Sequence, residues 1–469
     1  MSAFQFGVAS GDVTHDSVVL WTKTAPGAEV TWHCDDRSGT VTADPETGSV
    51  HVLVDDLAAG EQHGYWFEAD GDKSVDGRFR TIPTDRPVRF AVVSCAKFNS
   101  GYFNAYRAIA AMDDIDFVLH LGDYIYEAAE IPTGKQTAGA GLGRPMDPLG
   151  DCMNLSDYDT RYREYRGDAD LALLHTRHAM IATIDDHELS DNAWLGGAQE
   201  HDDARDGSWV DRVRAAMTVW GDWMPTMRRP AHGDPVWQEI DLGVAGRILL
   251  CEARLARSDP AGPDGPDKTA LGRTQREYVL DRLATPHTGW TFLAQPSMLA
   301  SVEAAASDPD ALFALRKLKL TEADEVVAFH DLWGTFGWEH DALREAVRAA
   351  DRTVVLSGDV HFSAEHADLD GEYVEWTVTS ITSPNLDDKM GWPRGAESKN
   401  YEAALLKMLP DLRWCDLDSH GFMIVESSDQ LASGQWWFVP TVREITDEVQ
   451  MGREVVLPSH PEGVENLSR

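Results

Sequence analysis

Hydrophobic and polar positions change their pattern once along the chain, near residue 84. Before that point, short runs of β-branched and aromatic residues recur at regular spacing, separated by turns rich in Gly and Asp. The runs that we predict to be strands are Ser17–Lys23, Val30–His33, Ser49–Val54, Tyr65–Ala69 and Arg78–Arg80. This pattern is typical of a small all-β sandwich. We therefore expect an N-terminal domain over residues 1–84.

After the proline-bearing linker Thr81–Pro87, near-continuous apolar strands alternate with amphipathic helices. The predicted strands are Val88–Ser94, Phe117–Leu121, Met180–Ile184, Arg247–Cys251, Thr291–Leu293, Thr353–Leu356, Glu375–Ile381 and Phe422–Glu426. The predicted helices are Ala105–Met112, Asp211–Trp223, Glu277–Ala284 and Asp341–Ala350. Such alternation predicts a layered α/β domain with helices outside the sheets, which we expect over residues 88–469.

Composition supports large cores and excludes a membrane span. The chain has 469 residues, of which 43% are hydrophobic, including 16 Trp. The longest apolar runs, such as Ala311–Leu315, are far shorter than the roughly 20 residues that cross a bilayer. The N-terminus has neither a basic nor an apolar signal region. We expect the chain as it stands in the cytoplasm, or secreted if a preceding signal has been removed.

The charge of the chain argues against nucleic-acid partners. Asp and Glu total 79 against 41 Lys and Arg, which gives a net charge of −38 that repels phosphate backbones. An acidic surface with few lysines suits a high-salt cytoplasm, and it equally suits an acidic protein from an arginine-favouring genome. The five cysteines form no C-x-x-C pair, so neither a zinc ribbon nor a disulfide framework is expected.

Polar side chains follow four of the predicted strands, at the point where each strand ends. The clusters are Ser94-Cys95, Gly122–Glu127, Asp185–Glu188 and Gly358–His361. Because ligands bind at the carboxyl ends of strands in α/β sheets, we expect these clusters to converge on one pocket. So many carboxylates repel one another, and metal cations relieve that repulsion. Asp and His suit zinc, manganese, iron or calcium, whereas a thiolate with a phenolate favours ferric iron.

Other readings of these residues stay open when each is taken alone. Cys95 fits a buried structural thiol, while Asp123 and Asp359 fit helix N-caps after a strand. The glycine-rich stretch Thr137–Gly143 lacks the G-K-[ST] of a phosphate-binding loop, and we expect a flexible loop there.

Taken together, the motifs resemble those of the alkaline phosphatase D (PhoD-like) family of metallophosphoesterases. The motifs of its catalytic domain are VVSCAKF, HLGDYIYE, IDDHELSDNAW, LSGDVHFS and EWTVTSITSP, and those of its N-terminal domain are FGVASGDVTHDSVVLWTK and VDGRFRTIP. The resemblance implies a four-layer α/β/β/α metallophosphatase domain preceded by a β-sandwich of the fibronectin or immunoglobulin type. It also implies hydrolysis of small-molecule phosphate esters by a metal-bound hydroxide, at a centre of two or more metal ions, iron and calcium.

The same resemblance implies the roles of individual residues. The implied metal ligands are Cys95, Asp123, Tyr126, Asp186, Asn192, Asp359 and His361. His187 matches the histidine that supports the leaving group. On an extended segment Tyr126 would face away from Asp123, so joint ligation requires the chain to turn by Ile125. Ala96 and Asp191 depart from the Gln and Asn usual in the family, which affects substrate contacts and charge but not the ligand set.

Three functions are compatible with these residues. The first is a phosphatase acting on phosphate monoesters and diesters. The second is a phosphodiesterase specific for a phospholipid, a nucleotide or a wall polymer. The third is a metal-stabilised binding protein without catalysis, against which the intact ligand motifs argue.

Overall fold

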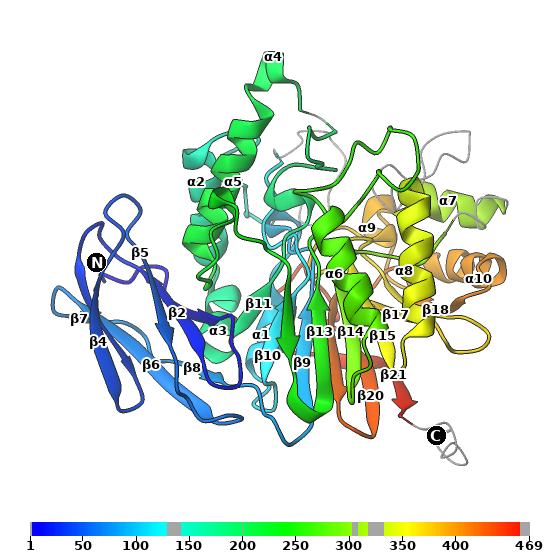
Figure 1. Ribbon diagram of the computed structural model, residues 1–469. Coiled ribbons are helices and arrows are strands. Elements are labelled where there is room, and N and C mark those ends of the chain that lie inside the picture. Colours follow the sequence, from blue (N-terminus) through cyan, green and yellow to red (C-terminus); the bar gives the residue numbers. More distant parts are fainter. Residues whose placement is uncertain (1, 129–141, 200, 303–307, 318–332, 460–469) are drawn as a thin grey trace.

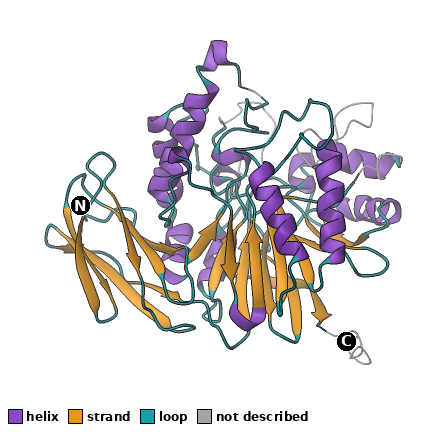
Figure 2. Ribbon diagram, viewed as in Figure 1, coloured by secondary structure: helices purple, strands orange, loops and turns teal. Residues whose placement is uncertain are grey.

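The computed structural model describes residues 2–128, 142–199, 201–302, 308–317 and 333–459. Most of the stretch Thr137–Gly143 lies outside these ranges. Two large β-sheets form the centre of the molecule, helices lie on both sides of them, and a smaller sheet stands at the N-terminal end (Figures 1 and 2).

The larger central sheet has nine strands in the order β21-β20-β19-β9-β10-β11-β1-β2-β5. Their bounds are β1 (Val8–Gly11), β2 (Val18–Lys23), β5 (Ser49–Val54), β9 (Val88–Val93), β10 (Phe117–His120), β11 (Met180–Ala182), β19 (Gly421–Ser427), β20 (Leu431–Phe438) and β21 (Gln450–Pro458). The three strands β9, β10 and β11 are parallel neighbours, so their carboxyl ends lie at one edge.

The second central sheet has seven strands in the order β12-β13-β14-β15-β17-β16-β18. Their bounds are β12 (Gln238–Asp241), β13 (Gly246–Leu250), β14 (Trp290–Ser297), β15 (Thr353–Gly358), β16 (Ser363–Ala367), β17 (Val374–Thr377) and β18 (Leu412–Asp416). The run from β13 through β14 and β15 to β17 is parallel, and β16 then returns antiparallel.

Part of the N-terminal region is continuous with the central sheet. The third sheet contains β3 (Glu29–Cys34), β4 (Arg37–Thr42), β6 (Gln62–Ala69), β7 (Asp72–Lys73) and β8 (Gly77–Arg80). Strands β1, β2 and β5 instead extend the nine-stranded sheet, because Gly11 of β1 pairs in parallel with Met180 of β11. The predicted domain boundary between residues 84 and 88 stays a prediction.

Helices cover the outer faces of the two stacked sheets. The helices are α1 (Asn104–Ala110), α2 (Leu155–Arg166), α3 (Ala169–Arg177), α4 (Asp203–Asp206), α5 (Trp209–Trp223), α6 (Arg273–Ala284), α7 (Pro309–Lys317), α8 (Gly337–Ala349), α9 (Leu386–Met390) and α10 (Ser398–Met408). One apolar cluster joins α1, α2, α3 and α5 to the nine-stranded sheet, and another joins α6 and α8 to the seven-stranded sheet (Figure 1). The predicted α/β/β/α layering with an all-β N-terminal region is confirmed.

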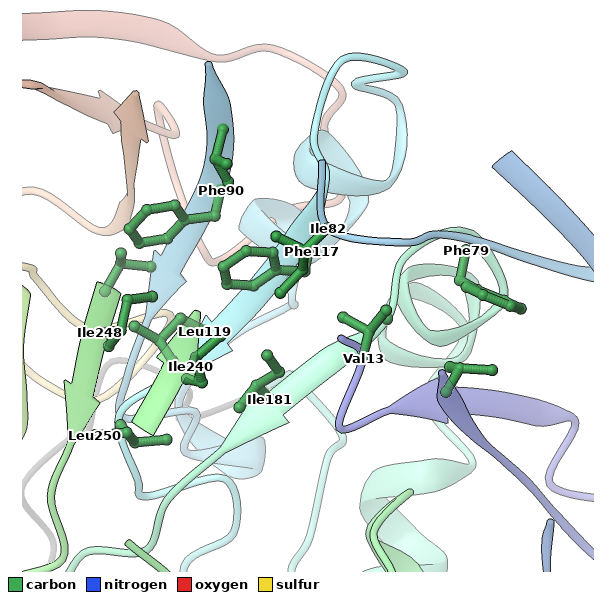
Figure 3. Close-up of a cluster of buried hydrophobic side chains, with 14 of the residues drawn as sticks. Val13, Phe79, Ile82, Phe90, Phe117, Leu119, Ile181, Ile240, Ile248 and Leu250 are labelled. Atoms are coloured by element: carbon green, nitrogen blue, oxygen red, sulfur yellow. The ribbon is translucent and has the colours of Figure 1, made fainter. Parts of the chain in front are cut away.

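The main core lies between the two central sheets. Figure 3 shows Phe90 and Phe117 from one sheet close to Ile248 from the other. The rings of Phe90 and Phe117 stack with centroids 5.0 Å apart, and Phe292 meets Phe90 edge-on at 5.7 Å. The contact of Phe90 with Phe292 joins the nine-stranded sheet to the seven-stranded sheet.

The inter-sheet core allows a stability prediction. Phe90 is fully buried, so Phe90→Ala is expected to lower the free energy of unfolding by about 3–5 kcal/mol through lost burial and an unfilled cavity. Leu53 is 53% exposed, and Leu53→Ala should change stability by no more than about 0.5 kcal/mol. Equilibrium unfolding in urea measures both values. Similar losses in the two variants would contradict this account of the core.

The five cysteines, Cys34, Cys95, Cys152, Cys251 and Cys415, are all free and buried, in line with the expected absence of a disulfide framework. Within the described ranges, no helix is both long and apolar enough to span a membrane.

Candidate metal centre

The carboxyl ends of four strands meet at one place. Strands β9, β10 and β11 end side by side, and β15 of the other sheet ends beside them. A Cβ atom placed on Gly358, the last residue of β15, would lie 2.5 Å from Ser94 Oγ, just beyond β9. The four polar clusters predicted from the sequence therefore converge, since only glycine permits this approach of the two sheets.

The backbone turns sharply where the predicted ligands begin. Five of the predicted ligands have positive φ angles, namely Cys95 (59°), Asp123 (56°), Asn192 (55°), Asp359 (69°) and His361 (60°). Residues other than glycine rarely adopt this conformation, and it concentrates at functional sites. The adjacent Gly122 has φ 103°, and a Cβ there would lie 2.5 Å from the amide nitrogen of Asp185. The loops after β10 and β11 are thus packed directly against each other.

One group of potential ligands contains a thiol, a carboxylate and an imidazole. Ligand atoms of Cys95, Asp123 and His361 all lie within 4.8 Å of one another. Tyr126 completes this group, since its Oη donates to Asp123 Oδ2 at 2.8 Å and lies 3.2 Å from His361 Nε2. Strand β10 ends at His120, and the chain turns at Asp123. This turn allows Asp123 and Tyr126 to lie on the same side, as their joint ligation requires.

A second group shares a member with the first. Ligand atoms of Asp123, Asp186 and His187 also lie within 4.8 Å of one another. The His187 amide donates to Asp123 Oδ1 at 3.3 Å, and the rings of Tyr126 and His187 lie 4.0 Å apart. Asp123 is therefore a member of both groups.

Asp359 and Asn192 lie at the margin of these groups. The Asp359 amide is 3.5 Å from Ser94 Oγ, and Ser94 Oγ lies 2.8 Å from Cys95 Sγ. The Asn192 amide donates to Asp186 Oδ2 at 2.7 Å, while the Asn192 side chain donates to Gln199 Oε1. The structure thus places both residues beside other predicted ligands, but among the described residues Asp359 is in neither group of mutually close ligand atoms.

Sequence reasoning missed the residues that hold these side chains. Glu127 Oε2 lies 2.7 Å from His187 Nδ1, and Glu127 Oε1 accepts from the Asp191 amide at 2.7 Å. The Glu188 carboxylate accepts backbone N–H groups from the loops after β10 and β11. Arg254 Nε donates to Asp185 at 2.5 Å. Glu127 and Glu188 are the last residues of two polar clusters named from the sequence, which was the available signal; Arg254 belongs to no such cluster.

The Nδ1 nitrogen of His361 is also held. It lies 3.2 Å from the carbonyl oxygen of Pro384, which can only accept, so His361 donates from Nδ1. Its Nε2 is then left as the nitrogen that faces Tyr126 and the first group.

Electrostatics at the site reflect crowded negative charge. Burial raises the pKa of Asp123 well above its usual range, and Asp186 adds to this against the opposing effect of His187. Burial and then the charges of Asp123 and Asp359 raise the pKa of the Cys95 thiol. Burial alone would lower the pKa of His187, but Asp186, Glu127 and Asp123 together raise it well above its ordinary value. Bound cations would relieve this repulsion.

The residues present fit metal ions. Asp186 Oδ1 is buried without a hydrogen-bond partner, with Arg254 Nη2 at 3.6 Å as an ion-pair contact. A buried carboxylate oxygen without a hydrogen bond is costly, and beyond its ion pair with Arg254 this oxygen still has lone pairs that a metal ion could bind. A thiol, a phenol, an imidazole and carboxylates meet within one cluster; with the thiol and phenol deprotonated on binding, this is a donor set for transition metals together with harder cations.

Known proteins match both parts of the chain. Residues 90–436 match the family model of the PhoD-like phosphatase, and residues 1–83 match that of the PhoD-like phosphatase N-terminal domain. The chain is 27% identical over 467 residues to alkaline phosphatase D of Bacillus subtilis (strain 168), covering 90% of this chain and 75% of that protein. The solved structure of PhoD is similar with a TM-score of 0.83 and 25% identity, covering 100% of this chain and 93% of that one.

Proposed function

This chain belongs to the PhoD-like phosphatase family and is a metal-dependent phosphoric ester hydrolase, and from this premise we propose that hydrolysis takes place at the cluster around Asp123. The observation that carries the proposal is the position of Asp123 in two groups of mutually close ligand atoms. Two metal ions bridged by one carboxylate suit an in-line displacement at phosphorus.

The proposed ligands can be assigned to two metal positions. Cys95, Tyr126 and His361 would hold one ion with Asp123, and Asp186 would hold a second ion with Asp123. Asn192 would add an amide oxygen on the side of Asp186, and Asp359 a carboxylate on the side of Cys95. The hydrogen bonds of Asn192 and Ser94 described above support these two positions.

The donor types support iron and calcium as the metals. A thiolate and a phenolate favour iron in the group of Cys95 and Tyr126, whereas carboxylate and amide oxygens favour calcium in the group of Asp186 and Asn192. When bound, such ions supply an activated water and neutralise the negative charge that develops on the phosphate oxygens.

His187 would support the leaving group. Its Nδ1 is paired with Glu127 at 2.7 Å, and the surrounding carboxylates favour its protonated form. A protonated imidazole at this position can donate a proton to the departing alkoxide. Glu127 would act through His187, because it orients the imidazole ring and stabilises its protonated form.

The substrate would be a small-molecule phosphate ester. Relative rates on aryl phosphate monoesters and diesters would decide between a phosphatase and a phosphodiesterase specific for a phospholipid, a nucleotide or a wall polymer. Membership of a hydrolase family stands against the third function, a binding protein without catalysis.

Removal of metal tests the proposal. Dialysis of the full-length chain against a strong chelator is expected to reduce hydrolysis of nitrophenyl phosphate at least about 100-fold, because the activated water and the charge neutralisation are lost together. Readdition of iron and calcium should restore the rate, and calcium alone should not. A rate that survives chelation, with metal loss verified by elemental analysis, would contradict the proposal.

A further inference from the structure

One short segment of chain contacts two of the proposed ligands. Residues 379–384 follow β17, and we refer to them as the 379–384 segment. The amide of Ile381 donates to the Ser94 carbonyl at 3.0 Å. The amides of Thr382 and Ser383 donate to the Cys95 carbonyl at 3.4 and 3.3 Å. The segment therefore fixes the backbone of Cys95 at the point where its φ angle is 59°.

The same segment orients His361. The Pro384 carbonyl oxygen lies 3.2 Å from His361 Nδ1, and Thr379 Oγ1 lies 3.4 Å from the His361 carbonyl oxygen. A fixed Nδ1–H contact sets which nitrogen of a ligating histidine is available to a metal and how the ring points. Movement of this segment would thus disturb a thiolate ligand and an imidazole ligand together.

A chain of buried side chains supports the segment from behind. Ser380 is fully buried, and its hydroxyl donates to the Ser383 carbonyl at 2.6 Å. His420 Nδ1 lies 3.0 Å from Ser380 Oγ, and His420 Nε2 lies 2.8 Å from Asp388 Oδ2. The Ser380 hydroxyl thus links the His420 ring to the Ser383 carbonyl. Arg443 lies 3.5 Å from the other oxygen of Asp388.

The charge on Asp388 keeps this chain of hydrogen bonds oriented. Burial opposes ionisation, but His420 and Arg443 hold the pKa of Asp388 below its usual range. The Asp388 carboxylate therefore accepts from His420 Nε2–H, and His420 Nδ1 pairs with Ser380 Oγ. Hydrogen bonds to an ionised group in a buried place are strong, so the chain can hold the 379–384 segment firmly.

We propose that Asp388 and His420 are positioning residues of the metal centre, which act through Ser380 and the 379–384 segment on Cys95 and His361. This inference rests on the proposed function. A serine, a histidine and an aspartate in this order also resemble a hydrolase triad. Ser380 is fully buried and its hydroxyl hydrogen is committed to Ser383, so it is not a nucleophile.

Cobalt(II) binding tests the inference without relying on turnover. Cobalt bound by the Cys95 thiolate gives a thiolate-to-metal charge-transfer band, whose intensity in a titration of the metal-depleted full-length chain measures affinity. We expect His420→Ala to bind cobalt about 10-fold more weakly and to alter the band, since outer partners of metal ligands have effects of this size. Ser380→Ala, which removes only a hydroxyl, should change the cobalt affinity and the band in the same direction. This milder variant keeps the test valid if His420→Ala does not fold.

His178→Ala is the matched control. His178 is buried like His420, its Nε2 lies 3.2 Å from the Ile109 carbonyl oxygen, and it is far along the chain from the 379–384 segment. This variant should keep the wild-type band and affinity even where its stability falls. Wild-type band and affinity in both His420→Ala and Ser380→Ala would overturn the inference. Absence of the band from the wild-type chain would instead overturn the proposed metal centre itself.

Discussion

Replacing Asp123 by Asn is expected to reduce hydrolysis of nitrophenyl phosphate by at least about 10³-fold, which is about 4 kcal/mol of transition-state stabilisation. Asp123 belongs to both groups of ligand atoms, so loss of its charge weakens both metal positions at once. Asn keeps the shape of Asp and tolerates the left-handed backbone that Asp123 adopts at φ 56°. The variant should therefore stay folded while metal content and rate fall together.

The matched control for this variant is Asp70→Asn. Asp70 is also an aspartate with positive φ, at 51°, but it is exposed and lies in the N-terminal sheet region. It should retain wild-type metal content and rate. Elemental analysis of the wild type, Asp123→Asn and Asp70→Asn measures metal content. Circular dichroism checks that each protein is folded, and kinetics gives the rate. Full activity in Asp123→Asn would contradict the assignment of the bridging carboxylate.

Replacing His187 by Asn is expected to have an effect that depends on the leaving group. A general acid matters most when the departing alkoxide is a strong base. The loss should be about 10²-fold for nitrophenyl phosphate and about 10⁴-fold for an alkyl phosphate, while metal content stays close to that of the wild type. Steady-state rates on the two substrates measure the difference.

Glu127→Gln separates the role of His187 from that of its partner. The amide keeps the contact at Nδ1 but removes a charge that raises the pKa of His187. The loss of rate should again be larger for the alkyl phosphate than for nitrophenyl phosphate, and for both substrates it should be smaller than in His187→Asn. His33→Asn, on β3 and stacked on Trp66 4.7 Å away, serves as the control and should have no effect on rate. Equal losses for both substrates in His187→Asn would contradict a role in leaving-group protonation.

Much of the fold could be predicted from local pattern. Strand β5 coincides with the predicted Ser49–Val54, β10 ends one residue earlier than predicted, and β13 begins and ends one residue earlier than predicted. Strands β16 and β20 were not predicted, because Ser363–Ala367 and the Ala-Ser-Gly part of Leu431–Phe438 carry small and polar residues. Their strand conformation comes from neighbours on both sides, which local pattern does not reveal.

The joining of the N-terminal strands to the central sheet was also not predictable. It depends on the pairing of Gly11 with Met180, two residues far apart in sequence, and the short strand Val8–Gly11 gave no signal of its own. The sequence pattern correctly indicated β structure there but not which sheet would receive it.

The sequence predicted the candidate metal ligands but not the contacts that hold those ligands in place. Cys95, Asp123 and His361 each follow the end of a strand, so their convergence could be expected once parallel strands were predicted. Contacts such as that of Pro384 with His361, or of His420 with Ser380, join segments by geometry alone. Ser380 and Pro384 lie in the recognised motif EWTVTSITSP, but neither that motif nor the residue type of His420 shows which group each one contacts.

The central claim is that this chain hydrolyses phosphate esters at a metal centre bridged by Asp123. The most direct measurement is elemental analysis of the purified full-length chain and of Asp123→Asn, with the rate of aryl phosphate hydrolysis measured on the same samples. We expect at least two metal ions per wild-type chain, iron and calcium, with metal content and rate both lost in the variant. A folded, active wild-type chain without bound metal, or a variant that keeps both metal and rate, would contradict the claim.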